Sequence, residues 1–363
     1  MEKRTVFPDY NNSLVNLSSS ILEAFGVQPV EPTLNGVDEL LKKDYKNVVL
    51  LLLDGMGIST MEKILDKQGA FWSNLLFPYS SVFPATTVAA TTSVLSAMPP
   101  VSHGWLGWDN YYPGVGENVT VFLNRKQGTG EILSVNCAEK FTPYKSIITL
   151  INENGGKAYG SSPFIAPYPK TLDSVLKRVK SLCNEEGRKF IYAYWTDPDC
   201  LLHGFGSESS EVRDELRNIE EKVSKLASSI SDTLFLITAD HGHIDTEGVY
   251  INDYPELMDT LIRLPSLEPR TPNFFVKEGK KDEFKRIFLD LFSDDFVLLD
   301  REEVLEKKLF GRGKEHPLFP EMLGDYLAYS KSDKTIFFYG ERLKSMHGSM
   351  TEDEMIIPLI AFK

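Results

Sequence analysis

The sequence predicts an α/β fold with a mostly parallel central sheet, helices on both of its faces and a smaller inserted α+β part. Three continuous apolar runs, each followed by a polar turn, are typical of strands buried on both faces: 47–53, 188–195 and 233–239. Residues 210–230 place valine, leucine and isoleucine at helical spacing over a charged face. This pattern predicts a helix that covers the sheet.

The character of the chain changes between residues 265 and 340, where charged stretches alternate with short apolar runs. This change predicts an α+β cap subdomain, 265–340, inserted into a core formed by 1–264 and 341–363. We expect both ends of the insertion to return to the rim of the sheet, so that the cap lies over that rim. The apolar run at the end of the chain is expected to rejoin the main sheet.

The formal net charge of −13 argues against two classes of partner. A surface this acidic does not neutralise the phosphates of duplex nucleic acid, and it does not favour an anionic membrane. Chemistry on a phosphate group would need local positive charge, most simply from metal ions. We expect a small-molecule substrate, and the sequence gives no indication of the oligomeric state.

The first residues lack the apolar stretch of a secretory signal, and no run reaches the ~18–20 apolar residues of a membrane span. We therefore expect no membrane segment and a cytoplasmic location. Three cysteines, Cys137, Cys183 and Cys200, are odd in number and irregularly spaced. This spacing argues against a disulfide framework and against a cysteine-based zinc site, so we expect free thiols.

Asp54 directly follows the apolar run 47–53. A side chain just beyond the carboxyl end of a parallel strand lies at the rim where α/β folds bind their ligands. The alternative is an aspartate that caps the following helix from the turn "DGMG". Asp54 is therefore a candidate ligand that needs support from other segments.

A second candidate pair lies in "TDPDCLLHGFG", which follows the run 188–195. Asp199 and His203 are four residues apart, a spacing that brings two side chains to one face of a helical turn. Such a pair can share an ion. Asp197 is a rival carboxylate, which we interpret as a turn residue or as a partner of a ligand.

A third candidate pair, Asp240 and His241, ends the strand-like run in "LITADHGHID". Adjacent residues of an extended chain point in different directions, so both reach one ion only where the strand breaks, as Gly242 permits. His243 is close by and is interpreted as a solvated loop histidine.

His347, in "MHGSM", is the last candidate ligand before the final apolar run. With the three preceding segments it gives three carboxylates and three imidazoles. Mixed oxygen and nitrogen ligands suit zinc, manganese or iron rather than calcium.

The candidate nucleophile is Thr87 or Thr86, in the stretch "SSVFPATTVAATTSVL". An extended, proline-containing segment is followed there by small helix-compatible residues, which places the threonines near a helix N-terminus that favours anions. A threonine at this position is commonly only an N-cap. As a nucleophile it would need a metal to lower the pKa of its hydroxyl.

The order Asp, Thr, Asp-x-x-x-His, Asp-His-Gly, His-Gly resembles the alkaline phosphatase superfamily, and most closely its type I phosphodiesterase/nucleotide pyrophosphatase branch. The resemblance covers nearly the whole chain except the insertion. It implies a three-layer α/β sandwich with two divalent metal ions, zinc first and manganese or iron as alternatives, bridged by a substrate phosphate. Carried over residue by residue, it implies one metal held by Asp54, Asp240, His241 and the nucleophile, and the other held by Asp199, His203 and His347.

The resemblance also favours Thr87 over Thr86. The family has a Ser or Thr-Gly pair nine residues after the nucleophile and a His-Gly further on. Ser96-Ala97 and His103-Gly104 match these marks from Thr87 without a gap. His103 is then expected to have a structural role in a turn.

The chain departs from the family at several points. Nucleotide pyrophosphatases carry an Asn three residues after the nucleophile, where this chain has Ala90. This puts nucleotide specificity in doubt. The phosphate-binding Arg of bacterial alkaline phosphatases is not identifiable, and the Cys-x-Pro-x-Arg signature of sulfatases is missing from the sequence.

The resulting hypothesis is a two-metal phosphohydrolase, similar to phosphodiesterases and nucleotide pyrophosphatases, that acts through a phosphothreonine. One alternative is a phosphomutase related to cofactor-independent phosphoglycerate mutase or phosphopentomutase, which share the metal pattern and an inserted domain. Another is a metal-binding scaffold without catalytic activity. The retention of all six ligands and a threonine argues against the scaffold.

Overall fold

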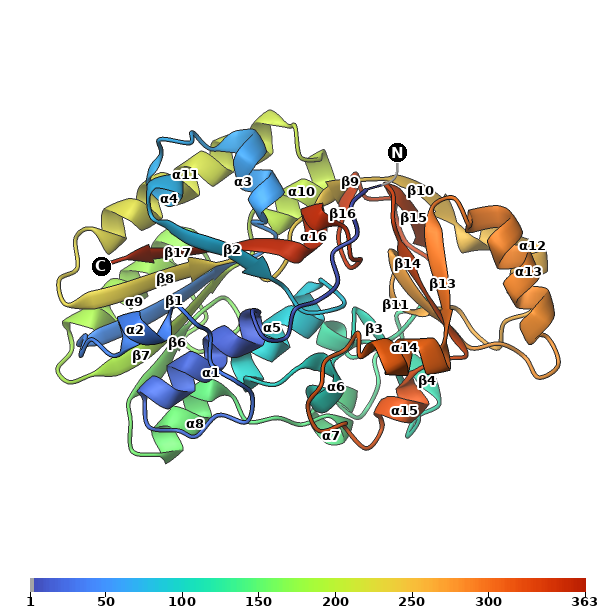
Figure 1. Cartoon of the computed structure of the whole chain (residues 1–363), viewed down its shortest axis with the longest axis horizontal. Helices are drawn as coiled ribbons and strands as arrows, with labels where there is room; N and C mark the ends of the chain where they lie inside the picture. Colours follow the sequence, from blue (N-terminus) through green and yellow to red (C-terminus); the bar gives the residue numbers. More distant parts are fainter. Residues whose placement is uncertain (1–2) are drawn as a thin grey trace.

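The computed structural model describes residues 3–363 of the chain. Figure 1 shows two sheets beside each other, the central sheet on the left and a second sheet on the right. The central sheet has the strand order β2-β17-β8-β1-β7-β6. Its strands are β1 (Asn47–Leu53), β2 (Leu75–Ser80), β6 (Ala158–Ser161), β7 (Lys189–Trp195), β8 (Thr233–Thr238) and β17 (Ile356–Phe362).

Four adjacent strands of this sheet, β8, β1, β7 and β6, are parallel. β17 lies between β2 and β8 and is antiparallel to both. The three predicted strands are thus confirmed as β1, β7 and β8. The last apolar run rejoins the main sheet, as predicted.

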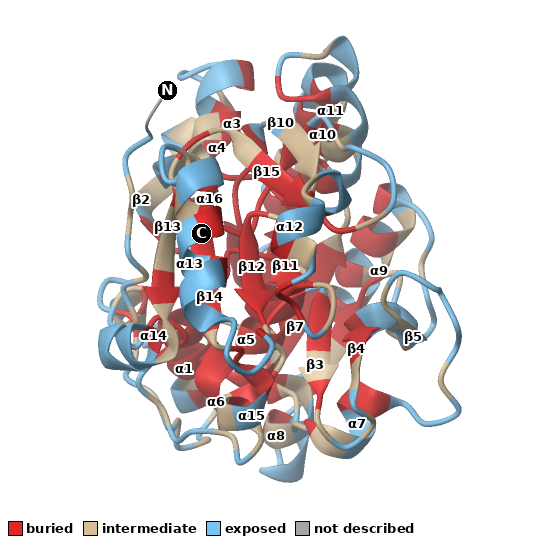
Figure 2. Ribbon diagram, turned by 90° about the vertical axis from the view of Figure 1, so that its right-hand side faces the viewer, coloured by how far each residue is buried: buried red, intermediate tan, exposed pale blue. Residues whose placement is uncertain are grey.

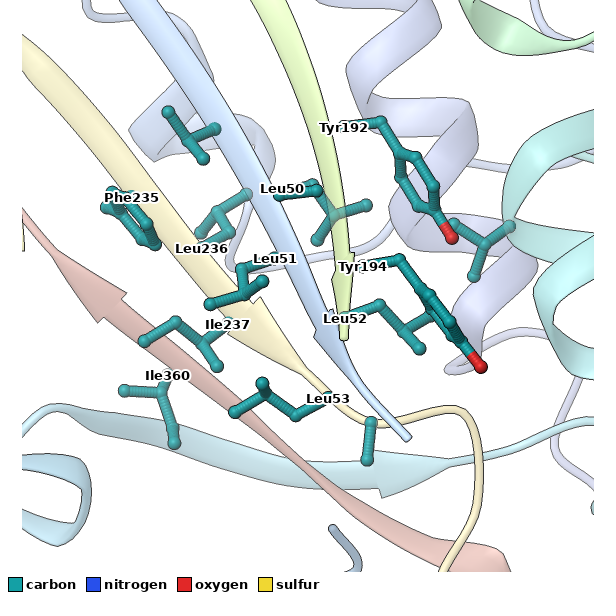
Figure 3. Packing of buried hydrophobic residues seen from close by; sticks show 14 of the residues in the cluster. Leu50, Leu51, Leu52, Leu53, Tyr192, Tyr194, Phe235, Leu236, Ile237 and Ile360 are labelled. Carbon is teal, nitrogen blue, oxygen red and sulfur yellow. The ribbon is translucent and has the colours of Figure 1, made fainter. Parts of the chain in front are cut away.

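All seven residues of β1 are buried, which explains the uninterrupted apolar sequence of this central strand. The β1 side chains alternate between the two faces of the sheet, and both faces are covered. Figure 3 shows Leu51 and Leu53 packed with Ile237 of β8, with Ile360 of β17 beside them. Each fully buried leucine stabilises the fold by about 1.5–3 kcal/mol relative to an exposed one.

Helices cover both faces of the central sheet (Figure 1). On one face α1, α5 and α8 contact one another, and on the other α11 contacts α3, α4, α9 and α10. The helices around this sheet are α1 (Leu14–Ala24), α2 (Asp38–Leu41), α3 (Ile58–Ile64), α4 (Ala70–Ser73), α5 (Thr87–Ser96), α8 (Ile147–Glu153), α9 (Leu172–Asn184), α10 (Asp199–Phe205), α11 (Ser210–Ala227) and α16 (Glu352–Met355). The three-layer α/β sandwich is therefore confirmed.

The predicted helix 210–230 is α11, which ends at Ala227. Its N-terminus is capped by Ser209, whose side chain accepts a hydrogen bond from the backbone N–H of Val212. The apolar positions at helical spacing are buried, while the intervening charged residues face solvent.

The second sheet is antiparallel and has the order β13-β14-β12-β11-β3-β4-β5. Its strands are β3 (Asp109–Tyr112), β4 (Glu117–Thr120), β5 (Arg125–Lys126), β11 (Ser266–Glu268), β12 (Thr271–Phe274), β13 (Phe296–Asp300) and β14 (Tyr326–Ser330). Three of these strands precede the predicted cap boundaries, 265–340. Strands from the segment that follows the candidate nucleophile therefore belong to the same sheet as the strands of the predicted cap.

Short elements complete this part of the molecule. They are α6 (Pro100–His103), η1 (Val121–Leu123), α7 (Cys137–Phe141), η2 (Ile251–Asp253), α12 (Pro255–Met258), α13 (Lys281–Phe292), α14 (Arg301–Lys307), α15 (Phe319–Met322), and the paired strands β9 (Ile244–Asp245) with β16 (Ser345–Met346) and β10 (Glu247–Tyr250) with β15 (Lys334–Phe337). Figure 2 shows the buried strands β11 and β12 behind the partly exposed helices α12 and α13.

No helix within residues 3–363 is long and apolar enough to cross a membrane. Cys137, Cys183 and Cys200 are free thiols, as predicted.

Candidate active site

Three loops at the carboxyl ends of neighbouring parallel strands bring the candidate carboxylates together. Asp54 follows β1, Asp199 begins α10 just beyond β7, and Asp240 follows β8. The backbone N–H of Asp54 donates to the carbonyl of Trp195 at 3.0 Å, and that of Asp199 donates to the carbonyl of Asp54 at 3.0 Å. The parallel register therefore sets the spacing of the site.

Asp54, Asp240 and His241 form the first group. His241 Nε2 lies 3.2 Å from Asp54 Oδ1 and 3.5 Å from Asp240 Oδ2. Asp54 Oδ2 accepts a hydrogen bond from the hydroxyl of Tyr194. The next helix, α3, has Gly57 as its N-cap, so Asp54 is not the capping residue.

Asp199, His203 and His347 form the second group. His203 Nε2 lies 3.3 Å from Asp199 Oδ1, across one turn of α10, as the four-residue spacing predicted. His347 Nε2 lies 3.6 Å from the same oxygen. The strand pair β9 and β16 brings His347 to this place from the far end of the chain.

His243 joins the second group, so its interpretation as a solvated loop histidine was wrong. Its side chain is fully buried, and its Nε2 lies 2.7 Å from Asp199 Oδ1. Its Nδ1 lies 3.1 Å from the hydroxyl of Ser345. Pairing of β9 with β16 begins one residue later, at Ile244, and folds this loop into the interior.

The histidines are oriented by their Nδ1 atoms, each of which lies near a backbone carbonyl. The distances are 2.7 Å from His203 to Ser345, 3.1 Å from His241 to Gly242 and 3.2 Å from His347 to Ala85. An Nδ1–H that donates to a carbonyl leaves Nε2 as the lone-pair atom, which is the arrangement common in metal sites. All three Nε2 atoms face the carboxylates.

Burial, followed by the negative charge of Asp199, raises the pKa of Asp54 well above its usual value. Burial, followed by the charge of Asp54, has the same effect on the pKa of Asp240. Burial would also raise the pKa of Asp199, but His203 and His243 lower it well below its usual value. Burial acts against a charged His203, yet Asp199 raises the pKa of that imidazole to about 9.

The other imidazoles of the second group stay neutral near pH 7. Burial lowers the pKa of His243 to about 4, and burial followed by the charge of His241 lowers the pKa of His347 well below its usual value. Neutral imidazoles are the form that binds metals.

These residues fit divalent cations. Asp240 Oδ2 is buried and has no hydrogen-bond partner among residues 3–363, which is costly for a carboxylate oxygen unless a cation compensates it. The ion-pair contacts of the three carboxylates within that range are with histidines only. Two sets of ligand atoms cluster within 4.8 Å, one from Asp199, His203, His243 and His347 and the other from Asp54, Asp199 and His241.

Thr87 is the first residue of α5, so its side chain stands at the helix N-terminus, beside Asp54 and His241. Its Oγ1 is 3.1 Å from His241 Nε2 and 3.4 Å from Asp54 Oδ1. Thr86 is the N-cap residue by position, but its side chain makes no capping hydrogen bond. It donates instead to Glu268 Oε1 at 2.6 Å. Only Thr87 therefore contacts the first group.

The model of the type I phosphodiesterase/nucleotide pyrophosphatase family matches residues 48–285. The chain belongs to this family. It is a phosphoester hydrolase by that membership, within the alkaline phosphatase superfamily, and the matched range includes Asp54, Thr87, Asp199 and Asp240.

Solved structures of other proteins share the fold. Human ectonucleotide pyrophosphatase/phosphodiesterase 5 has a TM-score of 0.67 and 16% identity, over 86% of this chain and 87% of that chain. An inactive variant of the murine protein in complex with AMP has a TM-score of 0.64 and 14% identity, over 86% and 87%. Phosphonoacetate hydrolase from Sinorhizobium meliloti 1021 in complex with phosphonoformate has a TM-score of 0.64 and 16% identity, over 88% and 91%. None of the curated proteins matches the sequence.

Other residues singled out in this phosphodiesterase-family chain lie outside the two groups. Asp197 is half-buried, and burial followed by the charge of Glu215 raises its pKa to about 6. His103 is buried at the end of α6; its Nδ1 accepts from the backbone N–H of Trp105 and its Nε2 donates to Ser93. These contacts fit the structural role predicted for His103.

Two residues that contact the site were not singled out from the sequence, Tyr194 and Glu268, and a third, His243, was singled out but given the wrong role. Tyr194 could have been found, because it is the last but one residue of β7 and points to the same face as Tyr192 (Figure 3). Glu268 is separated from Thr86 by 182 residues, and no local pattern connects them.

Proposed function

We propose that the chain is a two-metal phosphohydrolase that cleaves phosphoryl esters, in particular phosphodiesters, through a phosphothreonine on Thr87. The position of the Thr87 hydroxyl is the observation that carries this proposal, since it is 3.1 Å from His241 Nε2 and 3.4 Å from Asp54 Oδ1. A free threonine hydroxyl is hardly ionised at neutral pH. As a nucleophile, Thr87 would therefore need the positive charge of a metal ion held by these neighbouring residues.

The proposed ligands are Asp54, Asp240, His241 and Thr87 for one metal, and Asp199, His203 and His347 for the other. Zinc is the first expectation, with manganese or iron as alternatives, because the donors mix carboxylate oxygen with imidazole nitrogen. When bound, two such cations would lower the pKa of the nucleophilic hydroxyl and stabilise negative charge on the attacking and leaving oxygens.

The residues of the chain position the reacting groups. Thr87 Oγ1 gives up its proton to solvent and attacks phosphorus opposite the leaving oxygen. The new P–O bond forms as the ester P–O bond breaks, and the leaving oxygen departs as an alkoxide or phenolate that takes a proton from solvent when its basicity requires one. The N–H groups at the start of α5 precede the first intrahelical bond, which Ala90 donates to Thr86, and would be available to phosphoryl oxygens. Water then attacks the phosphothreonine, which releases phosphate or its monoester and restores the threonine hydroxyl.

The surroundings favour a substrate with an apolar or aromatic group. Phe164 is 69% exposed and its ring lies 5.9 Å from Tyr194, the hydrogen-bond partner of Asp54. Trp108 is 38% exposed, and its backbone N–H contacts Glu268. Ala90 in place of the family's Asn argues that affinity for nucleotides is weaker than in nucleotide pyrophosphatases.

The test uses protein reconstituted with zinc or manganese and bis(p-nitrophenyl) phosphate as substrate, with aryl phosphomonoesters, phosphonates and sulfates for comparison. We expect metal-dependent release of nitrophenol, fastest from the diester, and a phosphorylated Thr87 peptide in acid-quenched samples. Isomerisation of a sugar phosphate without release of phosphate would support the phosphomutase instead. Full metal occupancy without turnover of any ester would support the scaffold.

A further inference from the structure

Glu268 connects the second sheet to the segment that carries the candidate nucleophile. It ends β11, and its side chain is buried with 2% exposure. Its Oε1 accepts two hydrogen bonds, from Thr86 Oγ1 at 2.6 Å and from the backbone N–H of Trp108 at 2.7 Å. One carboxylate oxygen thus holds two loops from other parts of the chain.

Two residues near Glu268, Leu267 and Gly348, have positive φ, and Gly348 lies close to the Glu268 side chain. Leu267 adopts a left-handed conformation with φ of 70°, which is costly for a residue with a Cβ and persists only where the surroundings enforce it. Gly348, directly after His347, has φ of 110°, and a Cβ there would lie 2.9 Å from the Cβ of Glu268. The Glu268 side chain therefore lies between Thr86, the residue before the candidate nucleophile, and Gly348, the residue after the candidate ligand His347.

The contact with Thr86 fixes the residue before the nucleophile. Thr86 has an extended backbone, and Thr87 is the first helical residue of α5. The carbonyl of Thr86 accepts the first bond of the helix, from Ala90 at 2.9 Å. Because Thr86 does not cap the helix with its side chain, Glu268 is the group that fixes the orientation of its hydroxyl and hence of the turn into Thr87.

We propose that Glu268 is a positioning residue: through Thr86 it holds the Thr87 hydroxyl in line with the two ligand groups. This inference rests on the proposed function of Thr87. It assigns a role to the second sheet in the reaction itself, since β11 supplies the residue that orients the nucleophile. Glu268 neither attacks phosphorus nor binds a metal in this assignment.

The experiment compares Glu268→Ala, Glu268→Gln and Thr86→Val in the zinc-reconstituted full chain with bis(p-nitrophenyl) phosphate. A misplacement of the nucleophile by about 1 Å costs up to ~10²-fold. We expect Glu268→Ala to lower kcat by ~10²-fold with KM within about threefold of the wild type, and to slow phosphothreonine formation equally. Glu268→Gln keeps an acceptor oxygen and should recover most of this loss.

Thr86→Val removes the hydrogen bond between Thr86 and Glu268, and Glu268→Ala removes this bond and the one from the Trp108 N–H. Because the bond to Thr86 is the one that orients Thr87 in this assignment, Thr86→Val should lose as much kcat as Glu268→Ala, and the double variant should be no slower than either. Zinc content should stay at the wild-type value in all variants. Asp109→Asn is the matched control, since this buried carboxylate of the same sheet accepts from Thr120, Gln127 and Tyr339 rather than from Thr86. Its kcat should be unchanged.

Several outcomes would overturn the assignment. They are wild-type kcat in Glu268→Ala, a raised KM with unchanged kcat, loss of zinc, or an equal loss of kcat in Asp109→Asn. Thr87→Ala in the same assay separates this failure from failure of the proposed function. If Thr87→Ala turns over normally, the nucleophile is wrong; if it is inactive while Glu268→Ala is fully active, only the role of Glu268 is wrong.

Discussion

The regions of the central sheet and of the second sheet both contain buried charged residues, but these charges are compensated differently. In the second sheet, Arg270 is fully buried and forms two hydrogen bonds with Glu354, at 2.7 and 2.9 Å. At the rim of the central sheet, Asp54 and Asp240 have raised pKa values, and Asp240 Oδ2 has no hydrogen-bond partner among the described residues.

This difference indicates where a cation is required. A buried ion pair with matched hydrogen bonds is complete within the protein. The rim instead gathers three buried carboxylates with His203 as the one imidazole whose pKa is raised, so it can accept the further positive charge of a cation. The first arrangement links the turn between β11 and β12 to α16, and the second makes the rim the proposed site of the metal ions.

The largest effect is expected for Thr87→Ala, which removes the proposed nucleophile. Turnover of an aryl phosphodiester should fall by ~10³-fold or more, while zinc content and the unfolding midpoint stay close to the wild type. Ser96→Ala, at the other end of α5, is the control and should keep the wild-type rate. If Thr86→Ala is inactive and Thr87→Ala is active, the assignment is off by one residue; if both remain active, no covalent threonine intermediate forms.

Breaking the compensated pair should cost more stability than breaking an exposed one. Arg270→Ala leaves Glu354 buried and unpaired, so the free energy of unfolding should fall by about 3–5 kcal/mol. Arg286→Ala removes an exposed pair with Asp290 at 3.2 Å and should cost about 0–0.5 kcal/mol. The measurement is denaturant unfolding of both variants. Equal losses would mean that Arg270 and Glu354 do not form a structural pair.

A smaller effect is expected for His243, which contacts Asp199 on the uncompensated side. His243→Ala should weaken zinc binding by ~10–100-fold, because groups that orient a metal ligand contribute about that much to affinity. Zinc competition with a chelator measures it, with His316→Ala, remote from the site, as control. Unchanged affinity in His243→Ala would show that this histidine only fills space.

The predictability of each feature follows from the range of the interactions that produce it. The strand 47–53 could be predicted because burial on both faces requires a continuous apolar run, and the place of Asp54 at the rim follows from the parallel topology. Asp199 and His203 could be predicted because one helical turn joins them. His243 could not, because its burial depends on β16, about a hundred residues further along the chain. The same holds for Glu268, whose contact with Thr86 crosses between the two sheets.

The extent of the second sheet was also hidden from local patterns. β3, β4 and β5 are short, polar strands; β3 pairs with β11, β4 with β3, and β5 with β4, so the sheet forms only in the folded chain. Residues 265–340 remain a proposed cap subdomain. Deleting them would also remove Glu268 and Arg270, which form hydrogen bonds with Thr86 and Glu354 outside this range. We therefore expect substrate preference to be altered by substitutions at the surface of this region rather than by its deletion.

Metal analysis tests the central claim most directly. The chain is reconstituted with zinc or manganese, its metal content is measured, and the ions are located by anomalous diffraction. We predict two ions per chain, about 3.5–4 Å apart, one bound by Asp54, Asp240 and His241 and the other by Asp199, His203 and His347. Fewer than one ion per chain after reconstitution, or ions bound away from these residues, would contradict the account.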